Sequence, residues 1–367
     1  MTLGLCMIVK NESEVLERAL KSVIPFVDEI VIVDTGSTDN TIEIAKKFTD
    51  KVYYFDWIDD FSVARNFALS KVESDYWMWL DADDIVPKNT AEGIVEFMQN
   101  SNGNVDVIML PYVVEMTEDG KTIFSYYRER IIKNNSKYFW QGRVHEVVQP
   151  FGNIIKLPFE IVHEKPKDRS NNMRNLKIYR KSIADGNILS EREQYYYARE
   201  LYYNDFISEA IQEFTIFLAM PQGFYVNKID ACIMLAKCYL KINDIQSALD
   251  IVFHSFIYGL PTGEACCQLG SIYYNCKDYN KAIYWYKFAT LLKPDMDSGA
   301  FVDFSAYNFT PFLWLTVCYD KLGNKDKAYE YHCLSKEIFP NHPSVIFNQA
   351  YFESLGYNSQ YLTKGDS

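Results

Sequence analysis

Buried apolar runs alternate with amphipathic segments over the first 85 residues of the chain. Four runs have the length and composition of buried strands, at 3–9, 29–34, 52–55 and 76–80. Three segments between them carry apolar residues at spacings of three and four, as helices do, at 15–23, 41–48 and 61–72. Strands and helices that alternate in this way predict crossover connections and a Rossmann-like, mainly parallel sheet.

A polar or acidic side chain follows each predicted strand. These side chains are Asn11, Asp34, Asp60 and the acidic residues of Asp81–Asp84. Ligands of parallel α/β sheets bind beyond the carboxyl ends of the strands, so we expect these groups to converge there. The sequence contains neither a Gly-x-Gly-x-x-Gly fingerprint nor a Gly-Lys-Ser/Thr phosphate loop.

The acidic segment Asp81–Asp84 is the strongest candidate for a metal site. Asp81 and Asp83 are two residues apart, so in an extended segment both carboxylates leave the same face and converge on one cation. Carboxylate oxygens suit hard ions such as Mg²⁺ or Mn²⁺. The alternative interpretation is an ordinary turn or helix N-cap, because Asp side chains also accept hydrogen bonds from free backbone N–H groups.

More strands follow, with two histidines at the ends of apolar segments. We expect strands at 105–111, 112–118, 122–127 and 154–162. His145 and His163 are two of only five histidines, and each precedes a glutamate. Imidazole is a borderline ligand for divalent ions, so His163 is a candidate ligand, with a purely structural role as the alternative.

The second half of the chain has a repeating helical pattern. Equivalent alanines recur at spacings of 38, 34 and 46, namely Ala210, Ala248, Ala282 and Ala328. A period near 34 with small residues at helix contacts is that of the tetratricopeptide repeat. The pattern predicts helix pairs at 191–220, 226–257, 263–292 and 309–338, with a cap at 343–355. The insertion 295–308 is either a lip over an acceptor groove or a surface loop.

Composition narrows the class of protein. Lys and Arg total 37 against 49 Asp and Glu, a formal net charge of −12, which argues against a nucleic-acid partner. Eight cysteines lack paired Cys-x-x-Cys spacing, as in a reducing compartment. No leader segment and no apolar span of about 18 residues is present, so we expect a cytoplasmic protein without a transmembrane segment. A homodimer is left open.

Four motifs together resemble a known family. The blocks at 5–12, 32–39, 61–66 and 79–84 occur in the order and spacing of family 2 glycosyltransferases with the GT-A fold. Trp140–Glu146 and Val162-His163 resemble the subgroup that contains lipopolysaccharide-core glucosyltransferases and bacteriocin S-glycosyltransferases. The resemblance covers residues 1 to about 185 and implies a GT-A domain. With the change of composition after residue 167 and the helical repeat, we expect the GT-A domain at 1–167, a connecting helix at 168–190 and tetratricopeptide-like repeats at 191–357.

The resemblance also implies a role for each motif residue. Asp34 would receive the nucleobase, usually uracil, and Asp83 would bind an Mn²⁺ or Mg²⁺ ion that bridges the diphosphate. His163 matches a histidine that completes the metal shell in the family. The residues implied to hold the UDP-sugar are Asn11, Glu12, Asp34, Asp60, Arg65 and Asp81, and those implied to hold the metal are Asp83, His163 and Asp81.

Family 2 members invert the anomeric carbon, so the resemblance implies a base that takes the acceptor proton. Glu146 is the leading candidate, followed by Asp84 and His145, because the family's usual Glu-Asp pair is not obvious in this sequence. A cysteine thiol acceptor, with a free pKa of about 8.5, would need such a base less.

The expected function is therefore that of an inverting, metal-dependent glycosyltransferase. It would move a hexose or N-acetylhexosamine from a UDP-sugar to a Ser/Thr hydroxyl or Cys thiol of a protein or peptide that the repeats help to hold. The alternatives are transfer to a cell-envelope glycan or lipid-linked sugar, nucleotidyl transfer, and a non-catalytic repeat scaffold. A nucleotidyltransferase needs a basic loop near the first strand, which Lys10-Asn11-Glu12 provides poorly. The sequence names neither the sugar nor the acceptor atom.

Overall fold

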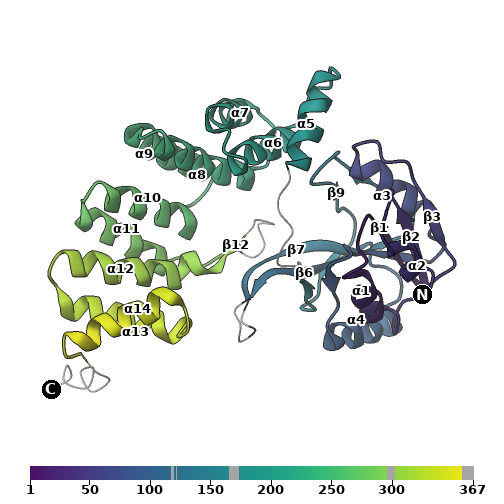
Figure 1. The fold of residues 1–367 in the computed structure, drawn as a ribbon, viewed down its shortest axis with the longest axis horizontal. Coiled ribbons are helices and arrows are strands. Elements are labelled where there is room, and N and C mark those ends of the chain that lie inside the picture. Colours follow the sequence, from purple (N-terminus) through teal and green to yellow (C-terminus); the bar gives the residue numbers. More distant parts are fainter. Residues whose placement is uncertain (117–119, 121, 165–172, 296–301, 358–367) are drawn as a thin grey trace. The chain divides into compact units, whose positions relative to one another are not determined.

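The computed structural model describes residues 1–116, 120, 122–164, 173–295 and 302–357, in two compact units, Met1–Glu200 and Leu201–Ser367 (Figure 1). The first unit is α/β and the second is helical, which confirms the predicted fold class. Helices α5 (Arg174–Ala184) and α6 (Glu191–Tyr203) follow the sheet, and α6 extends across the division at residue 200. The domain limits expected at 167 and 191 stay a prediction, and residues 165–172 lie outside the described part.

One mixed sheet organises the first unit, in the order β3-β2-β1-β4-β7-β6-β11-β5, with β10 paired to β6. The first four strands in this order are parallel, whereas β7 is antiparallel to both β4 and β6. The strands are β1 (Leu3–Val9), β2 (Glu29–Asp34), β3 (Val52–Tyr54), β4 (Tyr76–Trp79), β5 (Asp84–Ile85), β6 (Val107–Met116), β7 (Thr122–Lys133), β10 (Ile154–Lys156) and β11 (Ile161–His163). A separate pair is formed by β8 (Trp140–Gln141) and β9 (Val147–Val148).

Helices cover both faces of this sheet because the buried strands are apolar on both sides. Leu5 and Met7 of β1 pack in a core with α1 (Leu16–Val23) and α4 (Lys88–Asn100), and α2 (Thr41–Ala45) adds Ala45. Cys6, between them in sequence, faces the opposite core, to which α3 (Phe61–Leu69) contributes Ala68. Because successive residues of β1 face opposite sides of the sheet, α3 and the β8–β9 pair pack on the same face as Cys6.

Two strand predictions change in the structure. The segments expected at 105–111 and 112–118 form one strand, β6, over its described residues. The single strand expected at 154–162 is instead two short strands, β10 and β11. Pro158 lies between them, and a proline has no N–H to donate to a neighbouring strand, so the ladder is interrupted there.

The second unit consists of antiparallel helix pairs, and the expected pairs are present. Three of the turns within these pairs use the same local chemistry, whereas the N-cap Phe206 in the first pair is apolar. A residue with positive φ precedes a polar N-cap, as in Asn243-Asp244 and Lys277-Asp278, and the cap accepts a hydrogen bond from the N–H three residues on. The helices are α7 (Ile207–Ala219), α8 (Tyr225–Lys241), α9 (Ile245–His254), α10 (Gly263–Asn275), α11 (Tyr279–Leu291), α12 (Phe309–Lys321), α13 (Lys325–Ile338) and α14 (Pro343–Ser354).

Small residues allow the paired helices to approach closely. Ala210, Ala248, Ala282 and Ala328 are all fully buried.

Part of the insertion expected at 295–308 lies outside the described residues. Its described end forms β12 (Val302–Asp303) and a short 3₁₀ helix, η2 (Phe304–Tyr307), and another 3₁₀ turn, η1 (Ser255–Ile257), follows α9. No helix among the described residues is long and apolar enough to cross a membrane.

Gly270 of α10 provides a test of this close packing. A Cβ atom at this position would lie 2.7 Å from the ring of Tyr286 on α11, closer than side chains tolerate. Gly270→Ala should therefore lower the free energy of unfolding by roughly 1–3 kcal/mol, although alanine favours a helix by about 1 kcal/mol. Urea unfolding followed by circular dichroism would measure it, with Ser271→Ala on the same helix as control. Unchanged or increased stability would contradict the close contact.

Candidate active site

A cleft of about 960 Å³ opens in the first unit beyond the ends of β1 and β4. Most of the predicted site residues reach it, although they come from segments far apart in the sequence. Its lining residues are Ile8, Val9, Lys10, Asn11, Glu12, Thr35, Trp57, Phe61, Arg65, Trp79, Asp81, Ala82, Asp83, Arg128, Val144, His145, Glu146, His163, Arg174 and Asn175.

The acidic segment after β4 is a turn, not an extended strand. β4 ends at Trp79, and the N–H of Asp84 donates to the carbonyl oxygen of Asp81 over 3.1 Å. The expectation that Asp81 and Asp83 leave one face of a strand is therefore wrong in its geometry. The turn instead directs Asp81 to Arg65 and brings Asp83 and Asp84 to His163.

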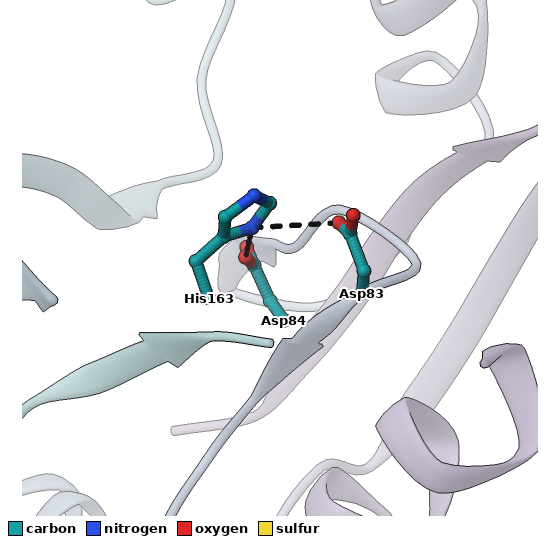
Figure 2. A group of neighbouring side chains, drawn as sticks. All are labelled: Asp83, Asp84 and His163. Carbon is teal, nitrogen blue, oxygen red and sulfur yellow. Dashed lines mark hydrogen bonds and ion pairs between the residues drawn. The ribbon is translucent and has the colours of Figure 1, made fainter. Parts of the chain in front are cut away.

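Asp83, Asp84 and His163 form a compact cluster (Figure 2). The Nδ1 atom of His163 lies 3.5 Å from Oδ1 of Asp83 and 3.2 Å from Oδ1 of Asp84. The strand β5 brings them together, because Asp84 pairs with His163 of β11 in the sheet register. Residues 79 positions apart thus meet because the first residue of β5 pairs with the last residue of β11.

Asp84 is the buried anchor of this cluster. Its carboxylate is fully buried, with Oδ2 at 3.0 Å from Nη1 of Arg130, and Oδ1 accepts a hydrogen bond from the hydroxyl of Tyr112 at 2.8 Å. The backbone N–H of Asp81 also donates to Oδ2. Although burial favours the neutral carboxyl, Arg130 and the hydrogen bond from His163 hold the pKa of Asp84 below its ordinary value.

The other two members titrate in ways that follow from their surroundings. Burial raises the pKa of Asp83 above its ordinary value, and the nearby charge of His163 opposes this. Burial favours the neutral imidazole of His163, but the hydrogen bond to Asp84 and the charge of Asp83 raise the pKa of His163. A divalent cation would favour an ionised Asp83 and a neutral His163, and would therefore lower the pKa of both groups.

The donor chemistry of this cluster fits a hard divalent cation. Two ligand atoms at right angles around Mg²⁺ lie roughly 3.0 Å apart, because each is about 2.1 Å from the ion. The 3.5 Å between Asp83 and His163 is close to that separation. Asp84 is already engaged by Arg130 and Tyr112, and its Oδ1 atom contacts the same Nδ1 atom of His163. A cation on Nδ1 would therefore replace that hydrogen bond, with the Asp84 carboxylate beside it.

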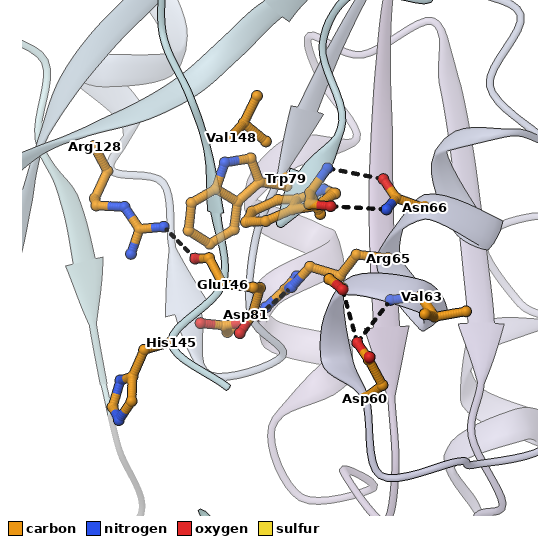
Figure 3. Close-up of polar contacts among 12 residues, drawn as sticks. Asp60, Val63, Arg65, Asn66, Trp79, Asp81, Arg128, His145, Glu146 and Val148 are labelled. Atoms are coloured by element: carbon orange, nitrogen blue, oxygen red, sulfur yellow. Dashed lines mark hydrogen bonds and ion pairs between the residues drawn. The ribbon is translucent and has the colours of Figure 1, made fainter. Parts of the chain in front are cut away.

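Arg65 of α3 connects two further acids of the cleft, Asp81 and Glu146 (Figure 3). Its Nη2 atom lies 2.6 Å from Oδ1 of Asp81, and its Nε atom lies 2.6 Å from Oε1 of Glu146. The guanidinium is buried over the rings of Trp79 and Trp140. The expected role of Arg65 in holding the UDP-sugar stays a prediction, whereas the structure places it between two carboxylates.

Asn66, next to Arg65, fixes the segment that leads to Glu146. Its side-chain amide donates to the carbonyl of Trp140 at 2.9 Å and accepts from the Trp140 N–H at 2.8 Å, so it pairs with that residue's backbone (Figure 3). The motif Arg65-Asn66 therefore contacts the block 140–146 at both ends, through Asn66 at Trp140 and through Arg65 at Glu146.

The expected nucleobase end of the cleft is built from two loops. The side-chain carbonyl of Asn11 accepts from the N–H of Thr38 at 2.7 Å, and the N–H of Glu12 donates to the hydroxyl of Thr41 at 2.7 Å. Asn11 itself has a φ of 55°, a conformation that asparagine adopts more readily than most residues. The carboxylate of Asp34 is buried and accepts N–H groups from Gly36 and Ser37. Its neighbour Thr35, not Asp34, lines the cleft.

Asp60 and His145 have structural contacts that the sequence does not reveal. Asp60 is the N-cap of α3 and accepts from the N–H of Val63, and it is not among the lining residues of the cleft (Figure 3). His145 lines the cleft, but its Nε2 atom is 3.0 Å from Glu200 of α6. The donor-binding role of Asp60 and the catalytic role of His145 stay predictions.

Sequence reasoning missed several residues around the site. Tyr112 and Arg130 hold Asp84, and Arg128 and Trp57 line the cleft. One usable signal was Arg128-Glu129-Arg130 inside a strand, since charges on buried strand positions need partners. Nothing in the pattern indicated which acid would pair with Arg130.

Comparison with known proteins gives matches to both parts of the chain. Residues 5–185 match the family model described as glycosyl transferase family 2, and residues 263–296 match a tetratricopeptide repeat. A TPR repeat-containing protein of Synechococcus elongatus is 36% identical over 148 residues, which cover 40% of this chain and 35% of that protein. The SPbeta prophage-derived glycosyltransferase SunS of Bacillus subtilis is 28% identical over 268 residues, which cover 67% of this chain and 61% of that protein.

The matches thus span 35% and 61% of the lengths of these two relatives. Among solved structures, glucosyl-3-phosphoglycerate synthase from Mycobacterium tuberculosis, with Mg²⁺ and UDP, is 20% identical. That match covers 30% of this chain and 43% of the other chain with a TM-score of 0.27, too low to carry an argument. The sequence matches identify the family. Residues 5–185 of this chain belong to glycosyl transferase family 2, and tetratricopeptide repeats follow them.

Proposed function

We propose that this protein is a metal-dependent, inverting glycosyltransferase that takes its sugar from a UDP-sugar and transfers it to a protein or peptide. The observation that supports this most is that a possible metal-binding cluster and a possible base line the same cleft. Asp83 and His163 would provide ligands for a cation, and Glu146, paired with Arg65, lines the same cleft. Family 2 membership of this unit supports sugar transfer as the chemistry.

Asp83 and His163 would hold Mn²⁺ or Mg²⁺ at the diphosphate of the donor. A divalent cation bound there stabilises the negative charge that UDP gains as the glycosidic bond breaks. Asp84, which Arg130 and Tyr112 keep in place, would position His163 before the cation binds and would lie beside the cation afterwards. Asp81 would contact the donor or remain paired with Arg65, since its side chain is 41% exposed.

Glu146 is the preferred base among the three candidates. Its carboxylate lines the cleft and is only 12% exposed, with Oε1 held by Arg65. We expect the acceptor proton to arrive at Oε2, while the acceptor oxygen or sulfur attacks the anomeric carbon opposite the departing UDP. Asp84 is less suited to this role, because it is fully buried and both of its oxygens already accept hydrogen bonds.

The repeats support a protein or peptide acceptor. Arrays of helix pairs offer extended surfaces that bind peptides, and the second unit of this chain is such an array. SunS, a relative that matches 67% of this chain, is described as a glycosyltransferase. Transfer to a cell-envelope glycan or to a lipid-linked sugar is the alternative outcome of an acceptor screen.

Calorimetry on the full chain tests the donor and the metal together. We expect UDP to bind in the presence of Mn²⁺ or Mg²⁺, and EDTA to weaken binding at least about tenfold, or more than ~1.4 kcal/mol, because no cation then offsets carboxylate–diphosphate repulsion. GDP serves as the matched control for base selectivity. A mass-spectrometric screen of UDP-sugars with peptide acceptors then identifies the sugar and the modified atom.

Each contrary outcome has a distinct meaning. Equal UDP affinity with and without EDTA would remove the metal from the proposal. Pyrophosphate release from a nucleoside triphosphate would favour nucleotidyl transfer. Absence of binding to any nucleotide would leave the protein as a repeat scaffold.

A further inference from the structure

The loop that carries Glu146 has an unusual backbone conformation. His145, directly before Glu146, has a φ of 54°, and Gly142 in the same loop has a φ of 94°. Glycine adopts positive φ freely, whereas histidine does so at a cost and needs its surroundings to keep it there. The direction in which Glu146 leaves the backbone therefore depends on what holds His145.

Three side chains of α6 hold His145. Its ring stacks on that of Tyr196, with centroids 4.2 Å apart and an angle of 16° between the planes. Its Nε2 atom lies 3.0 Å from Oε1 of Glu200. Arg192 donates from Nε and Nη2 to the backbone carbonyl of His145, both at 3.2 Å. Side chain and backbone of His145 are thus bound to a single helix.

Glu200 is well placed to be the centre of this set. It is buried, and its Oε1 atom also accepts a hydrogen bond from the side-chain amide of Asn175 on α5 at 2.9 Å. Burial opposes ionisation, but the hydrogen bonds from His145 and Asn175 lower the pKa of Glu200. Asn175 itself lines the cleft, so the network reaches from α6 through α5 to the site.

We propose that Glu200, Tyr196 and Arg192 are positioning residues of the active site, which keep His145 in its left-handed conformation and thereby direct Glu146 towards Arg65. This inference rests on the proposed function, with Glu146 as base. It also assigns His145 a positioning role in place of the catalytic role expected from sequence, because Glu200 occupies its Nε2 atom. Arg192, Tyr196 and Glu200 of α6 then support the active site through His145.

Single substitutions in the full chain test the proposal. Glu200→Ala should lower kcat for sugar transfer by roughly 10- to 100-fold, because a misdirected base loses its geometry, while KM for the UDP-sugar stays near wild type. Glu200→Gln keeps an acceptor oxygen for His145 and Asn175, so it should restore most of kcat. Glu191→Ala, on the same helix, is the matched control and should behave as wild type.

Hydrogen exchange measured by mass spectrometry gives a readout that needs no substrate. Amides of residues 143–148 should exchange faster in Glu200→Ala than in Glu191→Ala. Tyr196→Leu should do the same and Tyr196→Phe should not, because phenylalanine keeps the stacking, and this pair serves if Glu200→Ala fails to fold. Unchanged exchange and unchanged kcat in both Glu200→Ala and Tyr196→Leu would overturn the proposal.

The two readouts separate this inference from the proposed function. If the wild-type chain transfers no sugar but exchange at 143–148 responds as stated, the positioning network stands and the function fails. If kcat falls for Glu146→Gln but neither Glu200→Ala nor Tyr196→Leu changes kcat or exchange, the function stands and the positioning role is refuted.

Discussion

Asp83→Asn should lower the rate of sugar transfer by about 10²-fold or more. Asparagine has nearly the same shape but lacks the negative charge with which Asp83 would bind a divalent cation beside His163. Burial already raises the pKa of Asp83, so loss of this charge should not destabilise the folded chain and the melting temperature should remain close to wild type. Initial rates at saturating UDP-sugar, with Mn²⁺ titrated, would measure the effect.

Two further measurements make this result specific. Asp50→Asn changes an exposed carboxylate in the same unit and should leave the rate unchanged. The concentration of Mn²⁺ that gives half-maximal rate should rise in Asp83→Asn if the carboxylate binds the ion. A wild-type rate in Asp83→Asn would remove this residue from the metal site, whatever the outcome of UDP binding.

Arg130→Met should cause the largest loss of stability, about 3–5 kcal/mol in the free energy of unfolding. Both Arg130 and Asp84 are fully buried, and Arg130 Nη1 lies 3.0 Å from Oδ2 of Asp84. Methionine fills similar space but leaves the Asp84 charge without its cation in the interior. Arg18→Met, which breaks the exposed pair with Glu164, should cost at most about 1 kcal/mol and is the control.

The double variant Arg130→Met/Asp84→Asn decides whether charge or packing is responsible. If the unpaired carboxylate causes the loss, removing it should recover a large part of the stability, so that the double variant is more stable than Arg130→Met alone. Two substitutions whose effects simply add would show instead that Arg130 stabilises by packing between Trp79 and Tyr112.

The pH dependence should follow from the lowered pKa of Asp84. A carboxyl group with a lower pKa in the folded state binds fewer protons than in the unfolded state. Its contribution to stability is therefore present above the unfolded value of about 3.9 and is lost as the pH falls through the folded value. The stability difference between wild type and Arg130→Met/Asp84→Asn should shrink with acidification in that range, and urea unfolding at each pH would measure it.

Local patterns determined much of what the structure contains. Apolar runs of strand length predicted β1, β2 and β3 to within a residue, because burial on both faces leaves little choice of residue type. The recurring alanines predicted the helix pairs, since only small residues fit where two helices touch. That Asp83 would reach the cleft followed from strand ends that share an edge of the sheet, whereas the place of His163 beside it was implied by the family resemblance.

Only the tertiary structure shows which basic side chain each acid of the site contacts. Asp81 was expected beside the metal, yet a turn after β4 pairs it with Arg65, while the register of β5 on β11 brings Asp84 to His163. Such assignments depend on turns and registers of a few residues, which carry little periodic signal.

The sequence by itself therefore determined the two-part architecture, the edge of the sheet where the site forms and the family of its first unit, because these follow from hydrophobic periodicity and contiguous motifs. Only the tertiary structure decided that Arg130 would neutralise Asp84 and that α6 would hold the loop of Glu146. These pairs join residues about 50 positions apart, and a single sequence does not specify which charged groups meet once the chain is compact.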